Sequence, residues 1–238
     1  MKNIFAALLV AVIVGTASIA SAVNYSFSFF GSDKGGVGSA WMDIGLAGNQ
    51  LNMTLKNTSP VPVNQNYYNP AITGFGFNLI VENVAWSSWE LKAFDRVTNS
   101  LVTIGKNNLS SYLWTVGTTD AGVTLDYLPN ISGMEGALYN PDATDRFGAA
   151  PQYFTNAFLT MTFNTTSPLT LANEEYKNNS DETATYVRMQ SVGECGSGSL
   201  KLFGEERIPP SSVPEPGTMI LVGAGLAGIA LLRRAKRK

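Results

Sequence analysis

Between residues 23 and 204, short segments repeatedly carry apolar side chains at every second position. Successive side chains of a strand point to opposite faces, so this period of two predicts strands that each bury one face. No part of this region keeps a helical period for long. The clearest segments are Tyr25 to Phe29, Leu51 to Leu55, Val123 to Tyr127 and Leu159 to Phe163, and further candidates are Phe75 to Val81, Trp86 to Phe94, Tyr186 to Met189 and Leu200 to Phe203.

Clusters of Gly, Asn, Pro and Ser separate these segments, as in Asn57 to Pro60 and Asn140 to Asp142. Many short strands at this spacing predict an all-β fold, an antiparallel β-sandwich that is jelly-roll-like, in one domain over residues 23–204. The pattern leaves room for a minor helix around Ser110 to Val116. Residues 205–213, rich in charge, Pro and Ser, are predicted to be a linker.

The N-terminus has the composition of a cleavable signal peptide. Lys2 precedes an uncharged apolar run from Ile4 to Ile19, and Ala20-Ser21-Ala22 follows. Small residues at Ala20 and Ala22 are what signal peptidase accepts, so we expect a cut after Ala22 and a signal peptide over residues 1–22. A retained N-terminal anchor is the alternative.

The C-terminus carries a second apolar segment. Residues 218–232 are uncharged, and they are followed by a cluster of cations at the end of the chain. At ~1.5 Å per residue the segment spans roughly 24 Å, which snorkelling cations and local thinning of the bilayer extend to a membrane span. Because basic residues stay inside, we expect the domain to lie outside the cytoplasm. The cations are Arg233, Arg234, Lys236, Arg237 and Lys238.

Glycines in this segment form the letters GAGLAG, from Gly223 to Gly228, which fit a dinucleotide-binding loop. That loop needs a strand before it and a long βαβ unit around it, whereas only residues 229–238 follow. Gly and Ala are common in membrane helices, so we expect no nucleotide site and no cofactor.

Directly before the apolar segment stand Pro214, Glu215 and Pro216. Pro-Glu-Pro, a short Gly/Ala/Leu-rich helix and a terminal basic cluster resemble the PEP-CTERM sorting signal of exported Gram-negative proteins, here over residues 214–238. The resemblance implies that an exosortase recognises Pro214, Glu215 and Pro216 and cleaves nearby, after residues 218–232 have held the chain in the inner membrane. Residues 188–193 and 199–202 are similar to a final strand pair of other PEP-CTERM proteins.

The charge of the domain argues against nucleic-acid binding. Of 16 basic residues, Lys2 and the five of the tail lie in the terminal segments, whereas 17 of the 18 acidic residues precede Glu215. The ten basic and 17 acidic residues that remain give the mature chain a net charge of −7. Such a surface repels phosphates, so we expect no nucleic-acid partner.

The chain contains no histidine and a single cysteine, Cys195. This composition excludes Ser-His-Asp and Cys-His catalysis in their usual forms, as well as His-ligated zinc. We expect no metal and no catalytic residue, and Cys195 is interpreted as a structural free cysteine rather than a reactive thiol. The segment from Asn140 to Asp145 offers oxygen ligands for Ca²⁺ but lacks the usual loop pattern.

Paired carboxylates remain as an enzymatic alternative. Glycosidases need two carboxyl groups about 5 to 10 Å apart, and distant strands can supply them. The adjacent pairs Glu174-Glu175 and Glu205-Glu206 are poor candidates because neighbours on a strand face opposite ways. The alternative hypothesis is therefore a secreted carbohydrate-active enzyme whose two carboxylates are not neighbours in sequence.

Aromatic residues could form a sugar-binding surface, although most aromatic residues of a sandwich belong to its core. Tyr67 and Tyr68, in a polar loop rich in Asn, are the best candidates for sugar contact. The leading hypothesis is a non-enzymatic exported protein, processed by signal peptidase and an exosortase. It would be displayed at the cell surface or released into extracellular polysaccharide, with a structural, adhesive or polysaccharide-binding role. A stably anchored protein whose tail is never cut is a further alternative.

Overall fold

The computed structural model describes residues 23–60, 69–80, 85–107, 114–118, 122–127, 134–142, 153–172 and 185–207. These residues form an all-β fold of two antiparallel sheets without a helix. The strands are β1 (Val23–Asp33), β2 (Gly36–Ala47), β3 (Gln50–Asn57), β4 (Ala71–Asn78), β5 (Trp86–Asp95), β6 (Leu101–Lys106), β7 (Trp114–Thr118), β8 (Gly122–Tyr127), β9 (Phe154–Phe163), β10 (Tyr186–Val192), β11 (Gly198–Phe203) and β12 (Glu205–Arg207).

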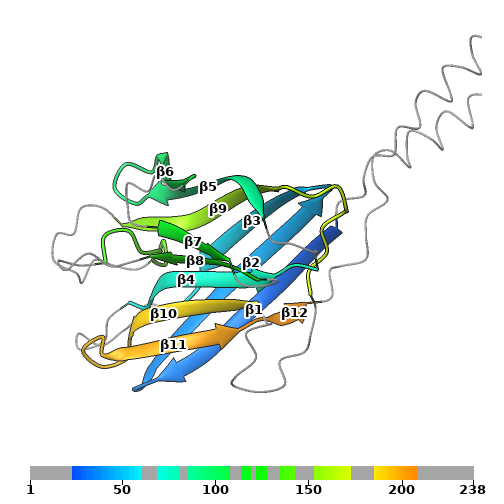
Figure 1. Cartoon of the computed structure of the whole chain (residues 1–238). Coiled ribbons are helices and arrows are strands. Elements are labelled where there is room, and N and C mark those ends of the chain that lie inside the picture. Colours follow the sequence, from blue (N-terminus) through cyan, green and yellow to red (C-terminus); the bar gives the residue numbers. More distant parts are fainter. Residues whose placement is uncertain are drawn as a thin grey trace, which may run out of the picture. The chain divides into compact units, whose positions relative to one another are not determined.

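The seven-stranded sheet has the order β12-β1-β2-β3-β9-β5-β6, and the five-stranded sheet has the order β11-β10-β4-β8-β7. Figure 1 shows the second sheet lying over the first as a separate layer. Among the described strands, β1 to β3 form a meander. The chain then crosses between the sheets before and after β4, between β6 and β7, before and after β9, and between β11 and β12. The predicted all-β class and the antiparallel pairing are confirmed.

The period-two pattern explains how the sheets pack. In β2 and β3 every second side chain is buried, and the alternate side chains face outward. Buried side chains from both sheets form one core, which includes Met42 and Leu55 of the first sheet and Phe75 and Met189 of the second. The two sheets therefore pack through their inner faces, and the alternate positions of β2 and β3 face outward, whereas every residue of β4 in the second sheet is buried.

Two hairpin tips dock at one end of the fold. The β1–β2 turn has φ values of 47° at Lys34 and 77° at Gly35, the positive pair that a two-residue turn of type I′ requires. Lys34 Nζ donates to the carbonyl of Ser197 at 2.9 Å, and the Glu194 amide donates to the Lys34 carbonyl at 3.2 Å. The β10–β11 turn is thus tied to the β1–β2 turn across the two sheets.

Two predictions from the sequence are corrected. Residues 205–207, predicted as the start of the linker, form β12, whose Glu205 and Arg207 lie opposite Ser28 and Ser26 of β1. The predicted helix at 110–116 is wrong in its described part, since Trp114 to Val116 belong to β7. In both places pairing with a neighbouring strand determines the local structure.

The predicted signal peptide (1–22) and residues 208–238, with the sorting tripeptide and the apolar segment, lie outside the described residues. Within the described residues no helix has the length and hydrophobicity to cross a bilayer.

Candidate functional site

The outer face of the seven-stranded sheet has a hollow of about 540 Å³ over β1, β2, β3 and β9. This volume lies within the range of small-ligand pockets. Strand register brings together residues that are far apart in sequence: Asn24 lies opposite Gly45, Gly45 opposite Asn52, and Asn52 opposite Thr160. A second row, parallel to the first, consists of Ser26, Asp43, Thr54 and Phe158.

Gly45 lies at the centre of the first row. A Cβ atom built there would be 3.0 Å from Oδ1 of Asn24 and 3.8 Å from the backbone carbonyl oxygen of Asn52. Every neighbouring position in this row has a side chain. The missing side chain at Gly45 therefore contributes directly to the hollow, with the amides of Asn24 and Asn52 on either side.

Polar groups line the hollow with defined hydrogen-bonding roles. Ser26 Oγ donates to Asp43 Oδ1 at 2.5 Å, and Thr160 Oγ1 donates to Asn52 Oδ1 at 3.2 Å. Oδ1 of Asn52 thus accepts a hydrogen bond within the sheet, and its Nδ2 group has N–H donors that can bind a ligand. Amide, hydroxyl and carboxylate groups therefore converge on one open surface.

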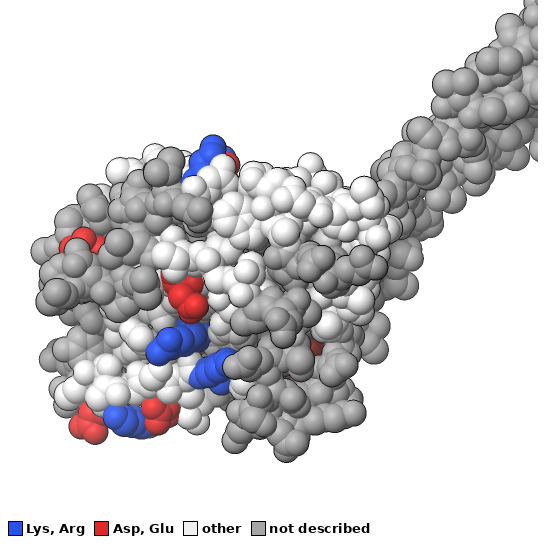
Figure 2. Space-filling view, viewed as in Figure 1, with Lys and Arg blue, Asp and Glu red and all other residues white. Residues whose placement is uncertain are grey.

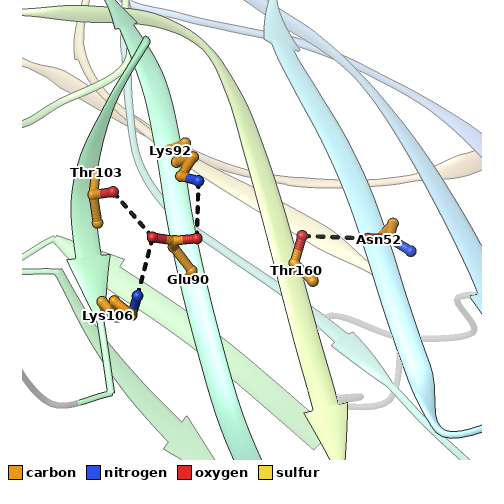
Figure 3. A network of polar contacts seen from close by, with 6 residues as sticks. All are labelled: Asn52, Glu90, Lys92, Thr103, Lys106 and Thr160. Atoms are coloured by element: carbon orange, nitrogen blue, oxygen red, sulfur yellow. Dashed lines mark hydrogen bonds and ion pairs between the residues drawn. The ribbon is translucent and has the colours of Figure 1, made fainter.

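Next to the hollow, on β5 and β6, the charged side chains neutralise one another. Figure 3 shows the carboxylate of Glu90 between Lys92 and Lys106, with the hydroxyl of Thr103 on one oxygen. The Nζ–Oε distances are 3.0 Å for Lys92 and 3.5 Å for Lys106. The hydrogen bond from Lys92 holds the pKa of Glu90 below its ordinary value, together with Thr103 and the charges of both lysines and against the opposing effect of burial.

Asp43 and Glu90, two carboxylates of this face, lie far apart and have separate partners. Asp43 is the one carboxylate among the residues that line the hollow. Glu90 is separated from it by β3 and β9, and three steps between neighbouring strands amount to roughly 14 Å of backbone separation. Asp43 also bonds to Ser26 on β1, whereas Glu90 bonds toward β6, so each carboxylate is held by partners on the side away from the other.

The aromatic residues divide between the core and this face. Trp89 and Trp114 are buried, which agrees with the expectation that most aromatic residues are in the core. Trp41 is 42% exposed and Phe30 is 75% exposed, and both lie on the outer face of the seven-stranded sheet. Tyr67 and Tyr68, predicted as sugar contacts, lie outside the described residues.

Two further residues that the sequence analysis considered, Asn140 and Cys195, lie at turns. Asn140 donates to the Ser59 carbonyl at 2.6 Å and accepts from the Asp142 amide at 2.9 Å, so its carboxamide supports a turn. Cys195 is exposed in the docked β10–β11 turn. The described residues contain no group of three or more His, Cys, Asp or Glu side chains arranged to hold a metal.

Sequence reasoning did not propose Asn24, Asp43, Gly45, Asn52 or Thr160 as ligand contacts. Each stands at an outward position of a strand, where polar residues are ordinary. A glycine inside a strand often marks close approach of a ligand or another backbone, but Gly45 gave no such signal because the sequence did not predict the strand that contains it.

Comparison with known proteins gives one match. The family model described as the PEP-CTERM protein-sorting motif matches residues 212–237. No curated protein and no solved structure matches the chain. The motif implies processing by an exosortase and export through a membrane-anchored intermediate to the cell surface. The chain therefore carries a PEP-CTERM protein-sorting motif at its C-terminal end.

Proposed function

We propose that this protein is an exported, non-enzymatic polysaccharide-binding protein that acts at the cell surface or in the extracellular matrix. After signal peptidase and exosortase have acted, the β-sandwich domain remains as the working part, and the outer face of the seven-stranded sheet binds glycan. Exopolysaccharide of the cell's own matrix is the proposed partner, in an adhesive or structural role within a biofilm.

The hollow at Gly45 is the observation that carries the proposal. Its walls present amides and hydroxyls, the groups that exchange hydrogen bonds with sugar hydroxyls. Trp41 lies on the same face, and a flat exposed ring can pack against the apolar face of a sugar. The separation and separate hydrogen bonding of Asp43 and Glu90 favour binding over hydrolysis.

Glycan binding is tested with the purified mature protein and a panel of soluble polysaccharides, by affinity electrophoresis and calorimetry. We expect retardation by at least one polysaccharide and no release of reducing ends. Gly45→Val fills the hollow with a residue that favours strands, so it should abolish binding while the protein stays folded. Thr162→Val, on the same face of β9 but outside the hollow, is the matched control. Equal binding by Gly45→Val and the wild type would contradict this site.

Processing is tested by mass spectrometry of the exported protein. We expect a mature form that begins at Val23 and lacks Arg233 to Lys238, and we expect Glu215→Ala to accumulate as the uncut precursor. A mature protein that still contains the basic tail would contradict exosortase cleavage and support the stably anchored alternative.

A further inference from the structure

Beyond the polar hollow, the outer face of β1 and β2 carries an exposed aromatic pair, Phe30 and Trp41. Phe30 lies opposite Ser39, and Trp41 lies opposite Ser28, so the two rings are diagonal neighbours on the outer face. Diagonal positions of antiparallel strands are roughly 7–8 Å apart, within reach of aromatic side chains. At 75% and 42% exposure, Phe30 and Trp41 present an apolar surface to solvent.

The aromatic pair and the hollow are separated by a defined distance along the strands. Gly45 lies four positions after Trp41, which corresponds to about 14 Å at ~3.4 Å per residue. The row of Ser26, Asp43 and Thr54 lies between them on the same face. We call this surface, from Trp41 and Phe30 through Asp43 to Gly45, the β1–β2 track.

Charged residues along the track have both signs. Asp43 lies on the track and accepts a hydrogen bond from Ser26, and Lys56 lies opposite Trp41. At the β12 edge, Glu205 lies opposite Ser28 and Arg207 lies opposite Ser26. A polymer of uniform charge would meet a like charge at one of these positions, whereas an uncharged polymer meets polar groups throughout.

We infer that the β1–β2 track binds a neutral, linear polysaccharide whose chain runs along the strands. One sugar occupies the hollow at Gly45, and a sugar several units further along stacks on Trp41. This inference rests on the proposed glycan-binding function and adds to it the class of ligand, its direction and a minimum length. A short oligosaccharide reaches the hollow alone, so affinity depends on chain length.

The test measures affinity by calorimetry for oligomers of two to six sugars. Three neutral series are used, derived from cellulose, xylan and dextran, with chitosan and alginate hexamers as the cationic and anionic probes. We expect affinity for at least one neutral series to rise with length, and the neutral hexamer to bind more tightly than either charged hexamer. Trp41→Ala should weaken hexamer binding by about 3- to 10-fold, the loss of one aromatic stacking contact, and should leave dimer binding unchanged.

Trp41→Phe is the matched variant and should retain most of the hexamer affinity, because a ring remains at this position. Equal affinity for dimer and hexamer, an equal effect of Trp41→Ala on both, or tighter binding of a charged hexamer would overturn the inference while leaving glycan binding intact. Absence of binding by every oligomer and by the polysaccharide panel would instead overturn the proposed function itself.

Discussion

Substitution of Asn57 tests how strongly side-chain hydrogen bonds stabilise the loops at the end of β3. Its side chain is 1% exposed, and its Nδ2 group donates to the carbonyls of Pro70 at 2.8 Å and Leu138 at 3.0 Å. Its Oδ1 atom accepts from the Ser59 amide at 3.0 Å. One carboxamide thus joins three chain segments that are far apart in sequence.

Asn57→Ala removes all three hydrogen bonds. At about 0.5–1.5 kcal/mol net for each bond, the expected loss in the free energy of unfolding is about 2–4 kcal/mol. The carbonyl of Leu138 keeps its bond from the Ile72 amide at 2.8 Å, so the loss should lie near the middle of this range. For a domain of this size each kcal/mol shifts the Tm by roughly 2–4 °C, which predicts a decrease of roughly 6–12 °C.

Guanidinium unfolding of the mature protein, followed by tryptophan fluorescence, measures this loss. Asn52→Ala is the control, because Asn52 is exposed and makes one long hydrogen bond, and its effect should stay within about 0.5 kcal/mol. Asn57→Asp should cost more than Asn57→Ala, since it aims a carboxylate oxygen at two carbonyls. A loss below about 1 kcal/mol for Asn57→Ala would refute the reasoning.

Three further substitutions test packing and electrostatics. Gly38→Ala places a Cβ atom 2.7 Å from Met189 Sδ and 2.9 Å from Leu200 Cδ1, so thermal unfolding should show a loss of about 1–3 kcal/mol that Gly45→Ala does not share. The pKa of Glu90 is lowered in the folded state, so its ion pairs stabilise the fold at pH values above the pKa of Glu90 in the unfolded chain, and this stabilisation is lost as the pH falls. Glu90→Gln should therefore reduce the loss of stability in acid, by less than about 1 kcal/mol because the pairs lie at the surface. Burial raises the pKa of Asp126, against the lowering effect of the charges on Arg188 and Lys201, so ionised Asp126 destabilises the fold. Asp126→Asn should therefore raise the Tm at pH 7 and have little effect on the Tm below pH 4. The opposite pH dependence would contradict this assignment.

Alternation predicted the strands whose inward positions are occupied by large apolar residues. The segments from Tyr25 to Phe29 and from Leu159 to Phe163 lie in β1 and β9, because burial of alternate side chains is the main force that fixes their register. β2 was missed although Ala40, Met42, Ile44 and Leu46 alternate in it. Its glycines and the preceding Gly31 to Gly36 segment favour a turn, and only pairing with β1 extends the strand to Gly36.

The charged strand β12 could not be predicted from the sequence for a different reason. Glu205 to Arg207 have no apolar alternation, and their strand conformation comes from pairing with β1 at the edge of the sheet. Figure 2 shows acidic and basic side chains of the described surface next to one another, among many uncharged ones, so charge alone does not locate a site on this view. The terminal segments of the sequence predicted an exported protein, whereas no pattern in the sequence predicted the proposed binding surface.

The hollow could not be predicted because it depends on register between four strands. Asn24 and Thr160 are 136 positions apart in sequence, and they line one surface because β2 and β3 lie between β1 and β9 in a particular alignment. A shift of one residue in any of these pairs would turn the lining side chains toward the core. The sequence contains the polar residues, whereas the pairing places them together.

The contact between β12 and β1 affects how the protein can mature. Ser26 lies opposite Arg207 in an antiparallel pair, so the described chain starts and finishes on adjacent strands at one end of the seven-stranded sheet. Under the predicted processing, both proteases work on segments that join the domain at this shared end, and neither cut removes a strand. The docked hairpins at Lys34 and Ser197 lie at the far end of the strands, so the two cuts can occur in either order without breaking the contact between these hairpins.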